Sequence, residues 1–162
     1  MRDLKELNLN TGGEPVITPA PTEAQLALVE QLIGVPLPDK YISFLQFSNG
    51  GHPELDTVSV DADGHENAWA VNRFFHIQAD SHTTKDTDDV IWNYYHRWPN
   101  APRELLPIAN TGGGDFFCLD LTTKGKGQIV IQIHDEPGFP IIPIADSFET
   151  FIDSLIIDPD DI

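Results

Sequence analysis

Three strand-like runs in the second half of the chain follow one another with only short glycine-containing segments between them. The runs cover residues 105–109, 115–121 and 128–134, and isoleucines alternate with other residues along the third. Connections this short join antiparallel neighbours, because parallel neighbours need a crossover of a dozen or more residues. We therefore expect consecutive antiparallel hairpins here, which argues against an alternating βαβ arrangement.

Two amphipathic helices are predicted ahead of these strands. Thr22 can cap the first helix together with Gln25 three residues later, and Gly34 ends it. Pro38 opens the second helix, which stops at Asn49. The apolar positions at helical spacing, which we expect in the core, are Leu26, Val29, Ile33, Tyr41, Phe44 and Leu45.

The middle and the end of the chain carry mixed patterns. Residues 57–60 and 69–77 are predicted as strands, with a turn at 61–64 between them. Residues 86–98 are predicted as a helix, and a last helix is capped by Asp146. This order of elements predicts an α+β fold with a mainly antiparallel or mixed sheet and helices packed on one side.

The length of 162 residues fits one domain with an ordinary apolar core. Residues 1–20 are rich in turn formers and are expected to form an N-terminal arm. The single domain is expected at 21–157, followed by a frayed acidic tail at 158–162.

The charge balance narrows the class of partner. Nine Lys+Arg stand against 26 Asp+Glu, which gives a net charge of −17. Such a field repels nucleic acid and anionic lipid and attracts a basic protein, so we expect no nucleic acid and no membrane among the partners. The alternative is that the acidity serves only solubility or a salty habitat. The sequence suggests neither a signal peptide nor a membrane span, so a cytoplasmic location is expected, and the oligomeric state stays open.

Local motifs predict no catalytic residue, no metal site and no cofactor. The six histidines form no HExxH pair, and Cys118 lies in an apolar run typical of a buried, inert thiol. Residues 61–66 resemble a calcium loop only up to the glycine, and the glycine-rich segment 111–115 lacks the lysine of a phosphate-binding loop. Residues 134–136 are interpreted as a strand end that runs into a turn.

Acidic residues near turns and strand ends are the candidates for contact with a protein partner. Trp92 joins them as a possible aromatic anchor, although core packing is the simpler interpretation of its aromatic neighbours. The candidate partner-binding residues are Asp56, Asp61, Asp63, Glu66, Asp86, Asp88, Asp89, Trp92, Asp115, Asp135 and Glu136.

An ordered series of short motifs resembles the SUKH superfamily, also called the Smi/Knr-like family. The series covers residues 22–51 and 104–156, and includes the strand Leu105 to Ala109, whereas residues 52–103 match none of its motifs. The matching residues, for which a structural role is expected, are Gly34, Leu37, Pro38, Tyr41, Phe44, Asn49, Gly50, Gly51, Gly114, Asp115, Ser147, Phe148 and Phe151.

The resemblance implies an α+β fold and a frequent role as a bacterial immunity protein. Such a protein binds and neutralises a polymorphic toxin, often a nuclease, while fungal relatives regulate cell-wall synthesis. The first hypothesis is therefore a non-enzymatic immunity protein that binds a basic toxin domain through an acidic surface. The alternatives are a regulatory scaffold that binds a cellular partner, and a hydrolase or metal-dependent enzyme whose residues meet only in the fold.

Overall fold

The computed structural model describes residues 1–11, 18–62, 65–80 and 83–162, without the side chains of 62, 65 and 66. Within these ranges the helices are α1 Glu23–Ile33, α2 Asp39–Phe47, α3 Val90–Tyr95 and α4 Phe148–Ser154, with 3-10 helices η1 Leu4–Leu7 and η2 Pro159–Asp161. The strands are β1 Thr57–Ala62, β2 His65–Ala70, β3 Arg73–Phe74, β4 Leu105–Asn110, β5 Phe116–Asp120, β6 Gln128–Gln132 and β7 Ile141–Ala145.

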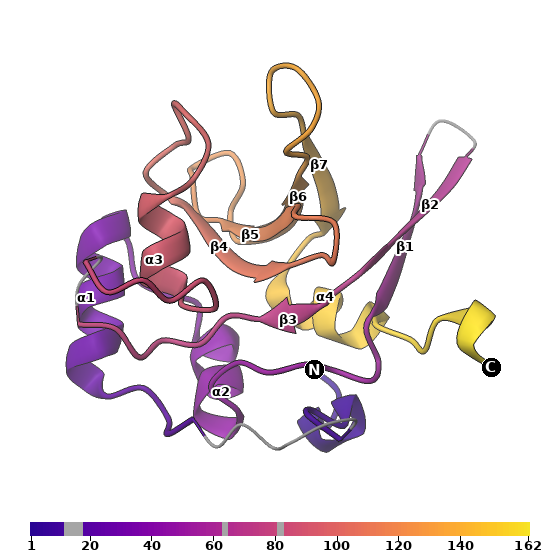
Figure 1. Ribbon diagram of the computed structural model, residues 1–162, viewed down its shortest axis with the longest axis horizontal. Helices are drawn as coiled ribbons and strands as arrows, with labels where there is room; N and C mark the ends of the chain where they lie inside the picture. The colour runs from indigo at the N-terminus through magenta and orange to yellow at the C-terminus, as the bar shows by residue number, and fades with distance from the viewer. Residues whose placement is uncertain (12–17, 63–64, 81–82) are drawn as a thin grey trace.

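Five of the strands form an antiparallel sheet in which neighbours along the chain are neighbours in space, in the order β3-β4-β5-β6-β7. The remaining two strands, β1 and β2, pair only with each other as an antiparallel hairpin. Figure 1 shows the sheet at the centre of the molecule and this hairpin to its right. The α+β fold and the antiparallel hairpins predicted from the three strand-like runs are confirmed.

The core lies between one face of the sheet and the helices α1, α2 and α4. Alternate residues of the central strands, such as Phe117, Leu119, Ile129 and Ile131, point into it and are fully buried. Helix α3 packs beside β4, and Trp98, three residues after its end, covers a small cluster on the opposite face. The prediction that the helices pack on one side thus holds for α1, α2 and α4, and α3 adds the buried Val90 and Ile91 to the same core.

Helix α1 begins and ends as its sequence predicts. The Thr22 hydroxyl accepts a hydrogen bond from Gln25 N, and Gln25 Oε1 accepts one from Thr22 N, which completes the capping box. Gly34 ends the helix with a φ of 80°, a conformation that favours glycine. Arg103 also donates to the carbonyls of Gln31 and Leu32, which places a positive charge at the negative end of the helix dipole.

Two predicted helix boundaries are wrong. The cap of α4 is Ser147 and not Asp146, because the Ser147 backbone is extended and its hydroxyl accepts from Thr150 N. The helix expected at 86–98 is reduced to α3, because Asp89 takes the capping position.

Two strand predictions also need correction. The strand expected at 69–77 is divided into β2 and β3, because the chain changes partners there: Val71 N bonds Asp56 O beside β1, and Asn72 N bonds Asn110 O of β4. Strand β7 was not predicted, since its apolar run does not alternate and contains Pro143. Proline is tolerated there because β7 is an edge strand.

The N-terminal end of the chain is attached to the body, whereas the C-terminal end carries a short helix of its own. Leu7 of η1 is buried in the core, and Arg2 donates to the backbone carbonyls of Asp153 and Leu155. The tail expected to fray contains η2, which Asp158 caps through Asp160 N. Among the described residues, no helix is long and apolar enough to cross a lipid bilayer.

Candidate protein-binding surface

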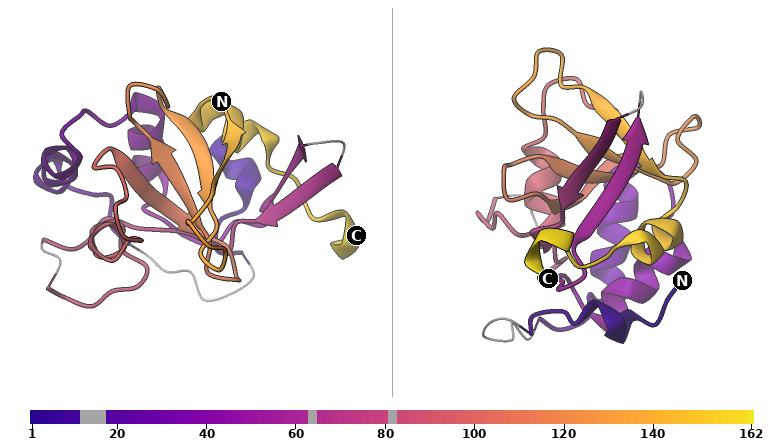
Figure 2. Two further views of the ribbon diagram at one scale, coloured as in Figure 1. Left: turned by 90° about the horizontal axis from the view of Figure 1, so that it is seen from above. Right: turned by 90° about the vertical axis from the view of Figure 1, so that its right-hand side faces the viewer.

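The β1–β2 hairpin stands apart from the five-stranded sheet (Figure 2). Its base is held by the buried Val58 and by two backbone hydrogen bonds of 2.9 Å that Thr57 exchanges with Ile156. Asp61 is exposed near its far end. The candidate residues Asp63 and Glu66 are also in this hairpin, but Asp63 and the Glu66 side chain lie outside the described part of the structure.

An acidic hollow lies at the base of the hairpin. It has a volume of about 370 Å³ and is lined by Thr11, His52, Pro53, Glu54, Asp56 and Asp161. Three of these six residues carry carboxylates, and no described lining residue is a lysine or arginine. Only Asp56 was a candidate from the sequence.

The chain ends build this hollow. The exchange of hydrogen bonds between Thr57 and Ile156 brings the segment before η2 beside the start of β1. Asn8 Nδ2 donates to Glu54 Oε2 at 2.6 Å, and Thr57 Oγ1 donates to Asp56 Oδ1 at 2.8 Å. Each of these two carboxylates is therefore oriented by a neutral donor.

A second acidic group lies where β5 begins and β6 ends. Asp115 Oδ1 accepts from the backbone N of His134 at 3.0 Å and lies 2.6 Å from His134 Nδ1. This hydrogen bond to Asp115 raises the pKa of the exposed His134 above its ordinary value. The candidates Asp135 and Glu136 follow directly and are exposed.

Ligand atoms of Asp115, His134 and Asp135 all lie within 4.8 Å of one another. None of these three residues lines the acidic hollow. His134 and Asp135 are exposed and Asp115 is half-buried, so the group forms a polar rim at the end of the sheet.

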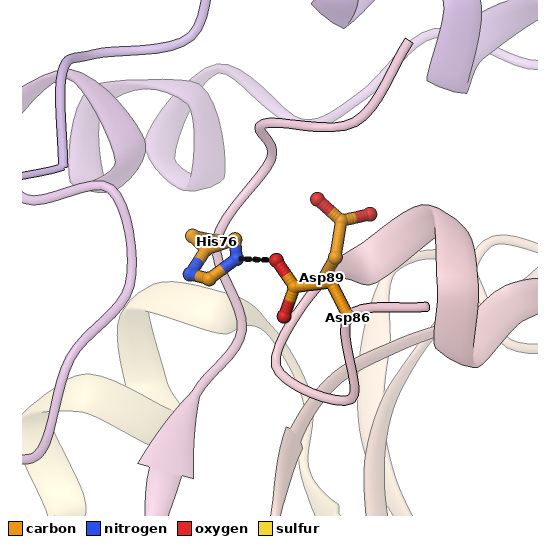
Figure 3. A group of neighbouring side chains, drawn as sticks. All are labelled: His76, Asp86 and Asp89. Atoms are coloured by element: carbon orange, nitrogen blue, oxygen red, sulfur yellow. Dashed lines mark hydrogen bonds and ion pairs between the residues drawn. The ribbon is translucent and has the colours of Figure 1, made fainter. Parts of the chain in front are cut away.

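His76, Asp86 and Asp89 form another group with metal-ligand chemistry (Figure 3). His76 Nε2 lies 2.7 Å from Asp86 Oδ2. Asp89 is fully buried, and each of its carboxylate oxygens accepts two backbone N–H bonds, from Ile91 and Trp92 on one oxygen and from Gln78 and Ala79 on the other. These four donors use the lone pairs that a metal ion would need, so Asp89 fixes the start of α3.

The expectation that Asp89 belongs to a docking surface is therefore wrong. Its neighbours differ: Asp88 forms an ion pair with Arg73 at 3.8 Å, and Asp86 is half-buried beside His76. The half-buried Trp92 stacks on His96, with ring centroids 3.7 Å apart. A hollow of about 300 Å³ lies here, lined by Gln78, Ala79, Asp80, Thr84 and Asp86.

Comparison with known families decides the class of this chain. The family model described as SMI1 / KNR4 family (SUKH-1) matches residues 20–154. This chain belongs to the SUKH-1 family. One relative is the SPbeta prophage-derived uncharacterized protein YokK of Bacillus subtilis (strain 168), which is 28% identical over 173 residues, covering 96% of this chain and 84% of the relative.

Several of the SUKH-type motif residues identified from the sequence lie in tightly packed parts of the fold. Tyr41 and Phe44 of α2 pack edge-on against Phe148 of α4, with ring centroids 5.3 and 5.6 Å apart. Gly50 has a φ of 85°, and a Cβ there would lie 2.9 Å from Phe74 O and His76 N.

A third hollow, of about 420 Å³, is lined by Val35, Pro36, Pro38, Leu121, Lys126, Gly127, Ser147, Phe148 and Glu149.

Glu54 and Asp161 are the site residues that sequence reasoning missed. No local motif could identify them, because they come from distant parts of the chain. The acidic run at 158–162 is the available signal, but a terminal run of this kind is expected to fray rather than to line a hollow.

Proposed function

We propose that this SUKH-1 protein is a non-enzymatic immunity protein that binds and neutralises a basic toxin domain. Its docking surface is the acidic hollow of Glu54, Asp56 and Asp161 together with the adjoining β1–β2 hairpin. The observation that carries the proposal is the convergence of three carboxylates in one hollow beside a projecting element. Family membership supports a protein-binding role, and the net charge of −17 supports a basic partner.

The charge distribution suits capture of a cationic partner. No described residue that lines the hollow is a lysine or arginine, and Arg97 and Arg103 are occupied by backbone carbonyls of other segments. Opposite charge speeds the encounter of two proteins, mainly within a Debye length of about 8 Å at physiological salt. A hollow that accepts a lysine or arginine side chain would also fix the orientation of the partner.

The chemistry of the described residues supports binding rather than catalysis. The buried Cys118 has a pKa raised by desolvation, so its thiol is not activated as a nucleophile. The Asp115–His134 pair lines none of the three described hollows.

Co-expression with the product of the adjacent gene tests the proposal. Cells that produce the wild-type protein should survive expression of the neighbouring toxin, and cells without it should not. The triple variant Glu54→Gln/Asp56→Asn/Asp161→Asn should protect less, at equal protein level. Equal killing with and without the wild-type protein would contradict the immunity role and favour a regulatory scaffold.

A further inference from the structure

The molecule protects the edges of its larger sheet. An exposed strand edge presents unpaired N–H and C=O groups to any extended chain, so native proteins shorten, interrupt or cover such edges. One edge strand of the five-stranded sheet, β3, is only two residues long, and the other, β7, contains Pro143. Neither edge offers a long uninterrupted ladder.

The edge of β2 lacks these features. β2 has six residues, no proline, and an exposed stretch that includes Asn67, Ala68 and Ala70. No described element lies along its outer side, and the left view of Figure 2 shows the hairpin projecting away from the five-stranded sheet.

The pairing pattern shows which backbone groups face outward. Val71 N donates to Asp56 O, so Asp56 and Val71 form a hydrogen-bonded pair. Hydrogen-bonded and non-hydrogen-bonded pairs alternate along an antiparallel ladder, so Val58 and Trp69, two residues further along, are again a hydrogen-bonded pair. Residues between such pairs direct their N–H and C=O groups away from the partner strand. Thr57 shows this orientation, because its backbone N–H and C=O bond Ile156, which lies outside the hairpin. On β2 the outward groups are therefore those of Ala68 and Ala70, which we call the free edge of β2.

We infer that the free edge of β2 receives an extended segment of the basic partner, which adds a third strand to the hairpin. This inference rests on the proposed function and names how the partner is held. Isolated two-stranded hairpins are only marginally stable, and a third strand would use the backbone groups of Ala68 and Ala70. Their side chains are small, so an incoming backbone meets no steric barrier.

Charge selects the occupant of this edge. The exposed Asp61 lies on β1 opposite residue 66, and the acidic hollow lies at the hairpin base. A basic segment along β2 would have the carboxylate of Asp61 on the neighbouring strand and would run toward the hairpin base, where the acidic hollow lies on the β1 side. A second copy of this chain would instead bring another net charge of −17 to the same surface.

Proline substitution tests the edge without breaking the hairpin. Ala68→Pro removes an outward N–H, which the β1–β2 ladder does not use, and should raise the Kd for the purified product of the adjacent gene about tenfold or more. Ser59→Pro removes the equivalent outward N–H from β1 and should leave the Kd unchanged. Ala68→Ser keeps the N–H and should bind as the wild type does.

Hydrogen exchange by NMR gives a second measurement on the wild-type complex. The amides of Ala68 and Ala70 should exchange more slowly in the complex than in the free protein. Tight binding by Ala68→Pro, with unprotected amides at these positions, would overturn the edge inference and leave the immunity role standing. No binding by the wild type would sink both. A dimer of the free protein that Ala68→Pro dissociates would assign the edge to a second copy and overturn the proposed occupant.

Discussion

Asn49 binds the backbone of Ile77 through both ends of its side-chain amide. Asn49 Nδ2 donates to Ile77 O at 2.9 Å, and Ile77 N donates to Asn49 Oδ1 at 2.8 Å. The same Nδ2 also donates to Pro19 O at 2.8 Å. The buried amide thus joins the end of α2 to the segment before α3 and to the segment before α1, which gives this SUKH motif residue a structural role.

Replacement of Asn49 should destabilise the fold. Asn49→Ala leaves the N–H and C=O of Ile77 without their partner in a buried site, so the free energy of unfolding should fall by about 2–4 kcal/mol. Urea denaturation measures the change. Asn72→Ala is a matched control, because the Asn72 amide makes an exposed 3.4 Å contact with Asn110 and its loss should change stability by less than about 0.5 kcal/mol. Equal stability of the two variants would contradict this role.

The Asp89 carboxylate should contribute about as much to the free energy of unfolding as the Asn49 amide does. In Asp89→Asn, an NH₂ group would face two of the four backbone donors, and we expect a loss of about 2–4 kcal/mol of unfolding free energy. Asp88→Asn removes the same charge from a half-buried ion pair with Arg73 and should lose less than about 1 kcal/mol. A stable Asp89→Asn protein would show that the carboxylate is not needed to begin α3.

Protonation of His134 should depend on Asp115. The hydrogen bond from the ring to Asp115 raises the pKa of His134 above the ordinary value of 6.5, and Asp135 adds a smaller effect in the same direction. Asp115→Asn should therefore lower this pKa toward 6.5, and Asp135→Asn should lower it less. NMR titration of the His134 ring measures both changes.

The sign of the pH effect on stability follows from this shift. A pKa that is raised in the folded state stabilises the fold below the unfolded value near 6.5, and the contribution is lost as pH rises through the folded value. The stability difference between wild type and Asp115→Asn should thus shrink as pH rises from about 6.5 through the folded-state pKa of His134. A His134 titration that is identical in both proteins would contradict the coupling.

Short-range sequence signals were sufficient to predict much of the fold. The capping box of Thr22 and Gln25 lies within one helical turn, so α1 could be predicted without tertiary contacts. Strand β7 could not be predicted, because Pro143 disfavours a strand unless the strand lies at an edge, and edge positions are set by tertiary structure.

The surface was harder to predict than the fold. Asp86, Asp88 and Asp89 are near neighbours in the sequence, yet the first is half-buried beside His76, the second is paired with Arg73 and the third is fully buried. Burial of a carboxylate depends on donors from other segments, here the backbone of Gln78 and Ala79.

The acidic hollow depends on the same kind of long-range contact. Glu54 and Asp161 meet because Ile156 pairs with Thr57, and no spacing along the chain indicates that pairing. The sequence could supply Asp56 as a candidate but not the two carboxylates that share its hollow.

The rate of association with the product of the adjacent gene, measured by stopped flow at increasing salt, tests the central claim most directly. The wild-type rate constant should fall steeply as salt rises from about 0.05 to about 0.5 M. Glu54→Gln/Asp56→Asn/Asp161→Asn should associate about tenfold more slowly at low salt and show a weaker salt dependence. The control Glu23→Gln/Asp39→Asn/Asp80→Asn removes the same number of carboxylates, all of them exposed and outside the hollow, and should resemble the wild type. Equal rates and equal salt dependence in all three proteins would contradict docking through the acidic hollow.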